Sequence, residues 1–160
     1  MRLFPNRKTL KPDDGGRWQF WRWFDVVEGD TVLLTRLTIL RTPWFQILLH
    51  WINGPDFTND LHDHPWAFVG FVLDGGYTEV KGQVADDKLI NSTFEKVDYF
   101  VSKRDPAEAH GIVAVEPNTK TLIFTGPARK SWSFFTPVGK KPGTGVDVLV
   151  IQTPWKDKYS

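Results

Sequence analysis

The sequence predicts an all-β fold, either a closed antiparallel barrel or a double-sheet jelly roll, from three observations. Short runs of β-branched and aromatic residues recur along the chain, 14% of which is aromatic. Glycine and proline, with 13 and 11 residues, separate these runs at short intervals. No window combines sustained helical periodicity with caps, and the best helical turn, DPAEA at 105–109, is too short to change the fold class.

An N-terminal hairpin opens a series of roughly ten predicted strands. The runs RWQFWRWFDVV at 17–27 and VLLTRLTILRT at 32–42 flank the turn EGDT. Later runs are bounded by proline, by Asp-Gly-Gly and by segments such as GPAR and GKKPGTG, and they span 44–52, 67–73, 77–80, 92–102, 109–116, 119–126, 130–137 and 146–154. Many short strands at close spacing are typical of antiparallel barrels and jelly rolls.

Length and composition bound the possibilities further. A chain of 160 residues is expected to form one domain over 1–160, with an N-terminal arm and hairpin over 1–30. Lysine and arginine number 20 against 19 acidic residues, so the net charge of +1 provides no general attraction to nucleic acid or membranes. Cysteine is absent, which excludes disulfides, thiolate nucleophiles and Cys-type zinc sites. No signal-type apolar segment or span of roughly 18 to 20 apolar residues occurs, which predicts a cytoplasmic protein.

The pentapeptide HDHPW at 62–66 carries the strongest chemical signal. It places His62 and His64, two of only four histidines, one residue apart in an apolar segment. If 62–71 is a β-strand, its two-residue period points both imidazoles to the same face, where they could bind one metal ion. His110, on a later predicted strand, is the candidate third ligand.

These residues resemble the two metal motifs of the cupin superfamily. The pair His62 and His64 matches the first motif, and Gly75 in LDGGY falls where that motif has a glycine. His110, after RDPAEA, is similar to the histidine of the second motif. The resemblance covers about 45–137 and is nearest to small single-domain cupins of bacteria and phages, which implies a cupin jelly-roll barrel extended by the N-terminal hairpin.

One departure from the cupin pattern bears on the chemistry. The motif has a glutamate where this chain has Phe68 or Val69, which leaves three neutral histidines as the implied ligands. Such a triad resembles that of thiol dioxygenases, so Fe²⁺ is the first expectation, with Zn²⁺, Mn²⁺ or Ni²⁺ as alternatives. The resemblance therefore implies a metal-dependent cupin enzyme acting on a small polar molecule, with a dioxygenase as the most specific version. The alternative is a non-catalytic module that binds a small ligand or a macromolecular partner, with or without a metal ion.

Further residues are candidates for the site. His50 could serve as a fourth ligand or an acid/base group, although a strand histidine bonded to the backbone is the alternative. Tyr77 and Tyr99 could place a phenol near the ion, or could only pack between strands. Arg129 could bind a substrate carboxylate or phosphate, against a solvated loop arginine. Acids that could orient the histidines and aromatics that could surround a ligand are Asp60, Asp63, Glu79, Trp66, Trp132 and Phe134.

The N-terminal segment supports two interpretations. Basic residues alternate with aromatic ones over 1–24, a combination used by single-stranded nucleic acid binders. The favoured interpretation is that one aromatic face packs on the barrel and the other against a second subunit, giving a homodimer, since the run continues directly into the hairpin. No GxSxG or Walker-type motif supports a serine hydrolase or a phosphate-binding loop.

Overall fold

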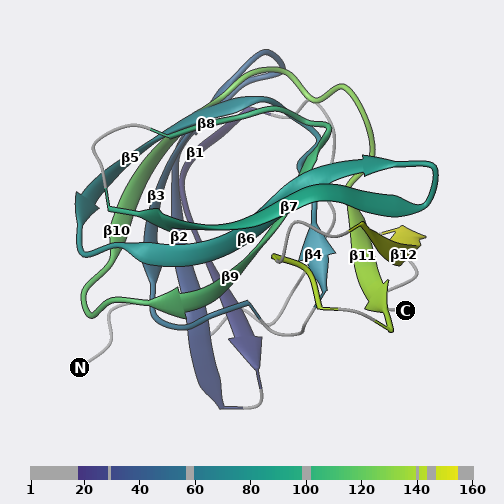
Figure 1. Cartoon of the computed structure of the whole chain (residues 1–160). Helices are drawn as coiled ribbons and strands as arrows, with labels where there is room; N and C mark the ends of the chain where they lie inside the picture. The colour runs from purple at the N-terminus through teal and green to yellow at the C-terminus, as the bar shows by residue number, and fades with distance from the viewer. Residues whose placement is uncertain are drawn as a thin grey trace.

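A computed structural model of the chain confirms the all-β prediction (Figure 1). It describes residues 18–28, 30–56, 60–98, 102–139, 141–143 and 147–154, and no helix occurs within these ranges. The strands are β1 (Gln19–Glu28), β2 (Thr31–Arg41), β3 (Gln46–Ile52), β4 (Leu61–His62), β5 (Phe68–Asp74), β6 (Tyr77–Ala85), β7 (Lys88–Val97), β8 (Ser102–Arg104), β9 (Glu108–Val115), β10 (Lys120–Thr125), β11 (Ser133–Val138) and β12 (Val148–Pro154).

The strands form two sheets. Sheet A is antiparallel with the order β1-β2-β3-β10-β5-β8, and sheet B is a closed barrel with the order β11-β12-β7-β6-β9-β4. In Figure 1 the strands β5, β10 and β3 lie on the left, whereas β4, β11 and β12 lie on the right. The chain therefore crosses repeatedly between the sheets, and β4 and β5, which flank HDHPW, belong to different sheets.

The faces of sheet A follow from the strand period of two. Its inner face carries Leu48, His50 and Ile52 of β3, and its outer face carries Ile47, Leu49 and Trp51. Leu34, Ile52 and Val72 of sheet A pack with four side chains of sheet B, namely Tyr77, Val97, Ile112 and Val115. The inner face of sheet A is thus packed against sheet B.

A second core lies within sheet B. Its buried residues come from all six barrel strands: Leu61, Val80, Leu89, Ala109, Phe135, Val148 and Val150. Leu61 and Ala109 in this core are the chain neighbours of His62 and His110, and strand alternation turns each neighbour to the opposite face. Both histidines consequently point away from this core and toward sheet A.

The predicted N-terminal hairpin is present. Strands β1 and β2 pair from Gln19 with Arg41 to Glu28 with Thr31. The arm before Trp18, including the basic residues over 1–17, lies outside the described residues.

A second hairpin corrects the predicted strand boundaries. The sequence predicted separate strands at 77–80 and 92–102, but β6 and β7 pair up to Ala85 and Lys88 around a two-residue turn. The turn residues Asp86 and Asp87 have φ of 49° and 56°, the left-handed values that such a tight hairpin requires. Aspartate adopts this conformation more readily than most residues, so the turn needs neither the glycine nor the proline used to place boundaries.

The expectation of one continuous strand over 62–71 was wrong. Strand β4 ends at His62, and β5 begins only at Phe68, in the other sheet. Pro65 in the connection has no N–H to donate to a ladder, and its carbonyl accepts a hydrogen bond from the Arg129 amide at 2.7 Å. The segment 105–109 is likewise a turn and not helical, with the Glu108 amide bonded to the Asp105 carbonyl.

Gly75 occupies the turn from β5 to β6, as the motif predicted. Its φ is +65°, and a Cβ atom there would lie 2.5 Å from Thr119 Oγ1. The same hydroxyl accepts a hydrogen bond from the Gly76 amide at 3.0 Å, so the close approach is part of the turn.

The part of the chain that the structure describes contains no helix with the length and apolar character needed to span a membrane.

Candidate metal centre

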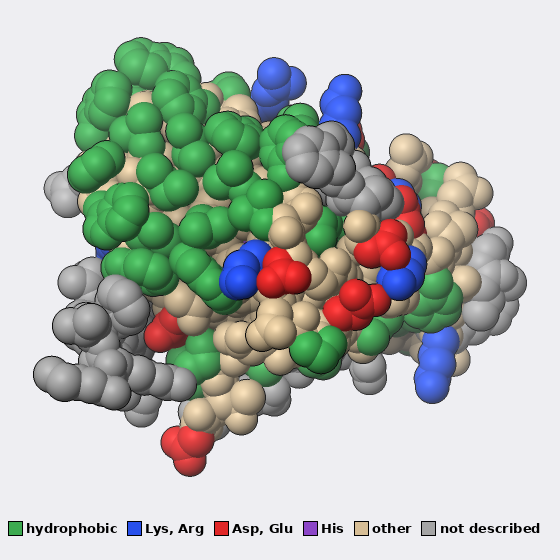
Figure 2. All heavy atoms as spheres, turned by 90° about the vertical axis from the view of Figure 1, so that its left-hand side faces the viewer, with side chains coloured by type: hydrophobic (Ala, Val, Ile, Leu, Met, Phe, Trp, Pro, Cys, Tyr) green, Lys and Arg blue, Asp and Glu red, His purple; other side chains and the backbone are tan. Residues whose placement is uncertain are grey.

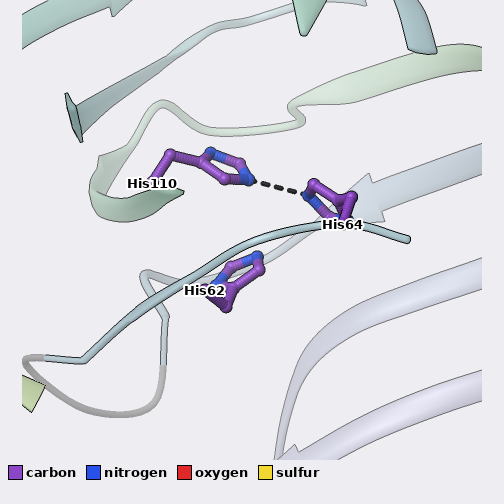
Figure 3. Close-up of side chains that lie close together, drawn as sticks. All are labelled: His62, His64 and His110. Carbon is purple, nitrogen blue, oxygen red and sulfur yellow. Dashed lines mark hydrogen bonds between the residues drawn. The ribbon is translucent and has the colours of Figure 1, made fainter. Parts of the chain in front are cut away.

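Three histidines from separate parts of the chain converge between the sheets. His62 lies on β4 and pairs directly with His110 on β9, and His64 follows β4 by two residues. One ligand nitrogen from each ring lies within 4.8 Å of the others. Figure 3 shows the three rings turned toward one another, with His64 Nε2 and His110 Nε2 2.8 Å apart.

This arrangement fits a metal ion. Ligand nitrogens around a tetrahedral zinc ion, at bonds of about 2.0 to 2.1 Å, lie about 3.3 Å from one another. The observed separations, between 2.8 and 4.8 Å, bracket that value. Small movements of the rings would therefore bring all three nitrogens onto one ion.

The rings are uncharged at neutral pH. Burial is the main cause that lowers the pKa of His62 to about 4 and that of His110 to about 4. Burial also lowers the pKa of His64 well below its usual value, helped by the neighbouring histidines. A metal ion binds imidazole through an unprotonated nitrogen, so the rings carry no charge that binding must remove, and an ion would replace the hydrogen bond between His64 Nε2 and His110 Nε2.

Glu79 orients His110. Its side chain is 0% exposed, and one carboxylate oxygen lies 2.7 Å from His110 Nδ1. The other oxygen forms an ion pair with Arg104, which also contacts Glu108 Oε1 at 3.3 Å. An Nδ1 proton donated to Glu79 leaves the Nε2 lone pair of His110 free for a metal, the usual support for a histidine ligand. Glu79 was one of three orienting acids named from the sequence.

Asp56 is an acid near His62 that the sequence analysis missed. Its Oδ2 lies 3.7 Å from His62 Nδ1 and accepts the Ile112 amide at 2.6 Å. Its charge partly offsets the effect of burial on the pKa of His62. Asp56 lies six residues before His62, in a loop whose path to β9 no sequence pattern indicated.

Asp63 braces the loop that carries the site. It is buried, and its carboxylate accepts the Ser133 amide at 2.8 Å and Lys130 Nζ at 2.5 Å. These contacts join the loop after β4 to the segment that leads into β11, so the hydrogen-bond partners of this candidate orienting acid are Ser133 and Lys130. Asp60, the third acid named from the sequence, is buried directly before β4.

The aromatic wall expected around the site is present. Trp132 lies 6.0 Å from His62 and 5.7 Å from His64, measured between ring centroids. Phe134 lies 6.1 Å from His62, and Trp66 stacks at 6.4 Å from His64. These rings shield the imidazoles from water, which strengthens electrostatic interactions at the centre.

Phe68 lies beside His64 at one of the two positions where a cupin glutamate would be expected. The two rings meet edge to face at a centroid distance of 5.1 Å. Within the described ranges, the group of possible metal ligands consists of His62, His64 and His110 and includes no acid. The chain thus offers three neutral nitrogen donors with a phenyl ring next to them.

His50 is held by an arginine and does not belong to the triad. Its Nε2 accepts a hydrogen bond from Arg36 Nε at 3.0 Å. Burial, followed by the Arg36 charge, lowers the pKa of His50 well below its usual value. The hydrogen-bond partner of His50 is thus a side chain, whereas the structural interpretation of this residue predicted a hydrogen bond to the backbone. No pattern in the sequence indicated Arg36.

The remaining candidates lie in different surroundings. Tyr77 is buried among cross-strand apolar neighbours between the sheets, as the packing alternative predicted. Arg129 is exposed on the loop before β11. Tyr99 lies outside the described residues.

Comparison with known proteins supports the fold. No protein-family model and no curated protein sequence matches the chain. Among solved structures, Fe(II)-HppE with the alternative substrate (S)-1-HPP aligns with a TM-score of 0.50 and 16% identity over 71% of this chain and 61% of that chain. A structure of FeII HppE gives a TM-score of 0.50 at 16% identity over 71% and 62%, and KdgF from Halomonas sp. gives 0.49 at 18% over 69% and 96%. The chain spans about three fifths of HppE, and what it shares with that protein is the cupin-type fold.

Proposed function

We propose that this protein is a mononuclear metal-dependent enzyme that acts on a small polar molecule, with Fe²⁺ as the ion and a dioxygenase as the most specific version. The observation that carries the proposal is the convergence of three ligand nitrogens within 4.8 Å. The contact of Glu79 with His110 supports it, because metal-binding histidines usually donate their other ring N–H to such a partner.

His62, His64 and His110 would hold the ion through neutral nitrogens. A divalent ion supplies Lewis acidity and, for iron, redox chemistry toward O₂. Because the three ligands carry no charge, the bound ion keeps its full double charge and favours an anionic donor from the substrate. Glu79 keeps the His110 imidazole aligned, and the aromatic rings of Trp132 and Phe134 exclude water.

Elemental analysis of protein purified without a histidine tag tests the proposal. We expect close to one divalent ion per chain, and loss of that ion in His62→Ala and His110→Ala. His50→Asn is the matched control, since it removes a nearby histidine outside the triad and should keep the ion. Wild-type protein that binds none of Fe²⁺, Zn²⁺, Mn²⁺ or Ni²⁺ would rule out the enzyme.

A non-catalytic binding module, with or without a metal ion, is the second candidate, favoured by the phenyl ring of Phe68 beside His64. The dioxygenase version predicts oxygen consumption by the iron-loaded protein with thiol or diketone substrates. Absence of turnover in protein that binds the ion would leave binding as its role.

We also propose a homodimer through the outer face of sheet A. Figure 2 shows hydrophobic side chains covering much of this side of the molecule. Leu73 is 52% exposed and Phe124 is 41% exposed on neighbouring strands of this face. Apolar patches of this kind are typical of protein interfaces. Sedimentation should show that the wild type is a dimer and that Phe124→Glu dissociates it. Ile151→Glu, a substitution at an exposed position of sheet B, is the control and should leave the dimer intact. A monomeric wild type contradicts the proposal.

A further inference from the structure

An arginine and a histidine lie opposite one another on the inner face of sheet A. Arg36 on β2 pairs with His50 on β3, and His50 shares that face with Leu48 and Ile52. Phe68 lies on the same face, because strand pairing runs from Gln46 through Thr125 to Phe68. Since Phe68 contacts the ring of His64, this face of sheet A borders the histidine triad.

Within the described part of the chain, Arg36 has no acidic partner, unlike the buried Arg104. Arg104 contacts two carboxylates, those of Glu79 and Glu108. Among the residues that the structure describes, the partners of Arg36 are His50 and the ring of Phe24, whose centroid lies 5.9 Å from the guanidinium carbon. Burial lowers the pKa of Arg36 to about 10, so it stays charged at neutral pH. A desolvated charge without a counter-charge is costly, which favours an anion beside it.

The hydrogen bond to His50 leaves the far edge of the guanidinium available. Arg36 donates Nε to His50 at 3.0 Å, and its two Nη groups retain four N–H donors. Paired donors of this kind match the two oxygens of a carboxylate or a phosphate group. His50 accepts through Nε2 in its neutral form, so it is a positioning residue that sets the orientation of Arg36.

We propose that Arg36, positioned by His50, is an anion-binding subsite on the face of sheet A that borders the triad, and that the substrate carries both a metal-binding oxygen and a separate carboxylate, phosphate or phosphonate group. The inference rests on the proposed function for the metal-binding end of the substrate. The anion end rests on Arg36 alone.

The test compares ligands that share one chelating end. Lactate and glycerate carry only an α-hydroxy acid, whereas tartronate, malate and 2-hydroxyglutarate add a carboxylate at increasing distance and 3-phosphoglycerate adds a phosphate. Dissociation constants are measured by the visible spectrum of Co²⁺-loaded protein. We expect at least one extended ligand to bind about 10-fold or more tightly than its short analogue, as for a charge-assisted contact.

Variants assign the preference to Arg36. Arg36→Met should abolish it while retaining Co²⁺, and Arg36→Lys should retain part of it. Lys88→Met, which removes an exposed positive charge, should leave it unchanged. Equal binding of all ligands, or a preference that survives in Arg36→Met or disappears only in Arg129→Met, overturns the proposal. Should Arg36→Met fail to fold, Arg36→Lys with an undiminished preference for both carboxylate and phosphate ligands would overturn it.

A metal-free arm separates this inference from the proposed function. Malonate and inorganic phosphate, compared with chloride at equal ionic strength, should raise the melting temperature of metal-free wild type more than that of Arg36→Met or Arg36→Lys. If the wild type binds no added metal but shows an Arg36-dependent shift, the missing metal refutes the enzyme and the shift supports the subsite. Equal shifts in all three proteins overturn the subsite, whatever the metal content.

Discussion

Replacing Glu79 by glutamine should weaken both the fold and the metal centre. Glu79 is fully buried, and its two oxygens contact His110 and Arg104, of which Arg104 is only 4% exposed. Glutamine keeps the shape of the side chain and removes its charge, which leaves the guanidinium with Glu108 at 3.3 Å as its remaining acid. Breaking a buried ion pair typically costs about 3 to 5 kcal/mol, and loss of an orienting partner lowers metal affinity about 10- to 100-fold.

Urea unfolding in the presence of a chelator measures the first effect, and competition with a chromophoric chelator measures the second. Glu95→Gln is the matched control, because Glu95 forms a half-exposed ion pair with Lys81 and should cost at most about 1 kcal/mol. If Glu79→Gln unfolds with the same free energy as the control and binds metal as tightly as wild type, then the carboxylate neither balances Arg104 nor aligns His110.

Three further perturbations have defined outcomes. In metal-free protein, burial holds the pKa of His62 and His110 near 4 against 6.5 in the unfolded chain, so unfolded protein takes up protons first as the pH falls. Urea titrations should show the free energy of unfolding decreasing by about 1.4 kcal/mol per pH unit for each of these histidines between pH 6.5 and 4, and a flat profile contradicts this. Phe68→Glu introduces an oxygen donor beside the triad and should tighten Mn²⁺ binding in calorimetry, unlike Phe68→Leu. Gly75→Ala forces a Cβ onto Thr119 at positive φ and should lower the free energy of unfolding by about 1 to 3 kcal/mol, whereas no measurable loss would mean that the turn relaxes.

The strands were predictable where apolar runs ended at proline or glycine. The hairpin of β6 and β7 was missed because Asp86 and Asp87 make its turn, and both tolerate the left-handed conformation without being a strong signal for it. The break after His62 was missed because HDHPW reads as the start of the following apolar strand, although the flanking strands belong to different sheets.

The site was predictable in its histidines and incomplete in its surroundings. His62, His64 and His110 were identified as a group because the spacing of the cupin motifs can be read from a single sequence. Asp56 and Arg36 were not, since Asp56 approaches His62, and Arg36 contacts His50, through pairings between strands and loops that only the folded topology creates. Sequence periodicity specifies which face a side chain occupies, but it does not specify which distant strand lies opposite.

The carboxylate of Glu79 spans the two layers of the molecule. It lies on β6 of the barrel, and Arg104, its ion-pair partner, lies on β8 at the edge of sheet A. Any free energy by which metal binding at His110 stabilises β8 through this contact is equal, by reciprocity, to that by which ordering of β8 stabilises the bound metal. Metal binding should therefore slow amide hydrogen exchange over 102–104. A change that destabilises β8 should in turn weaken metal binding.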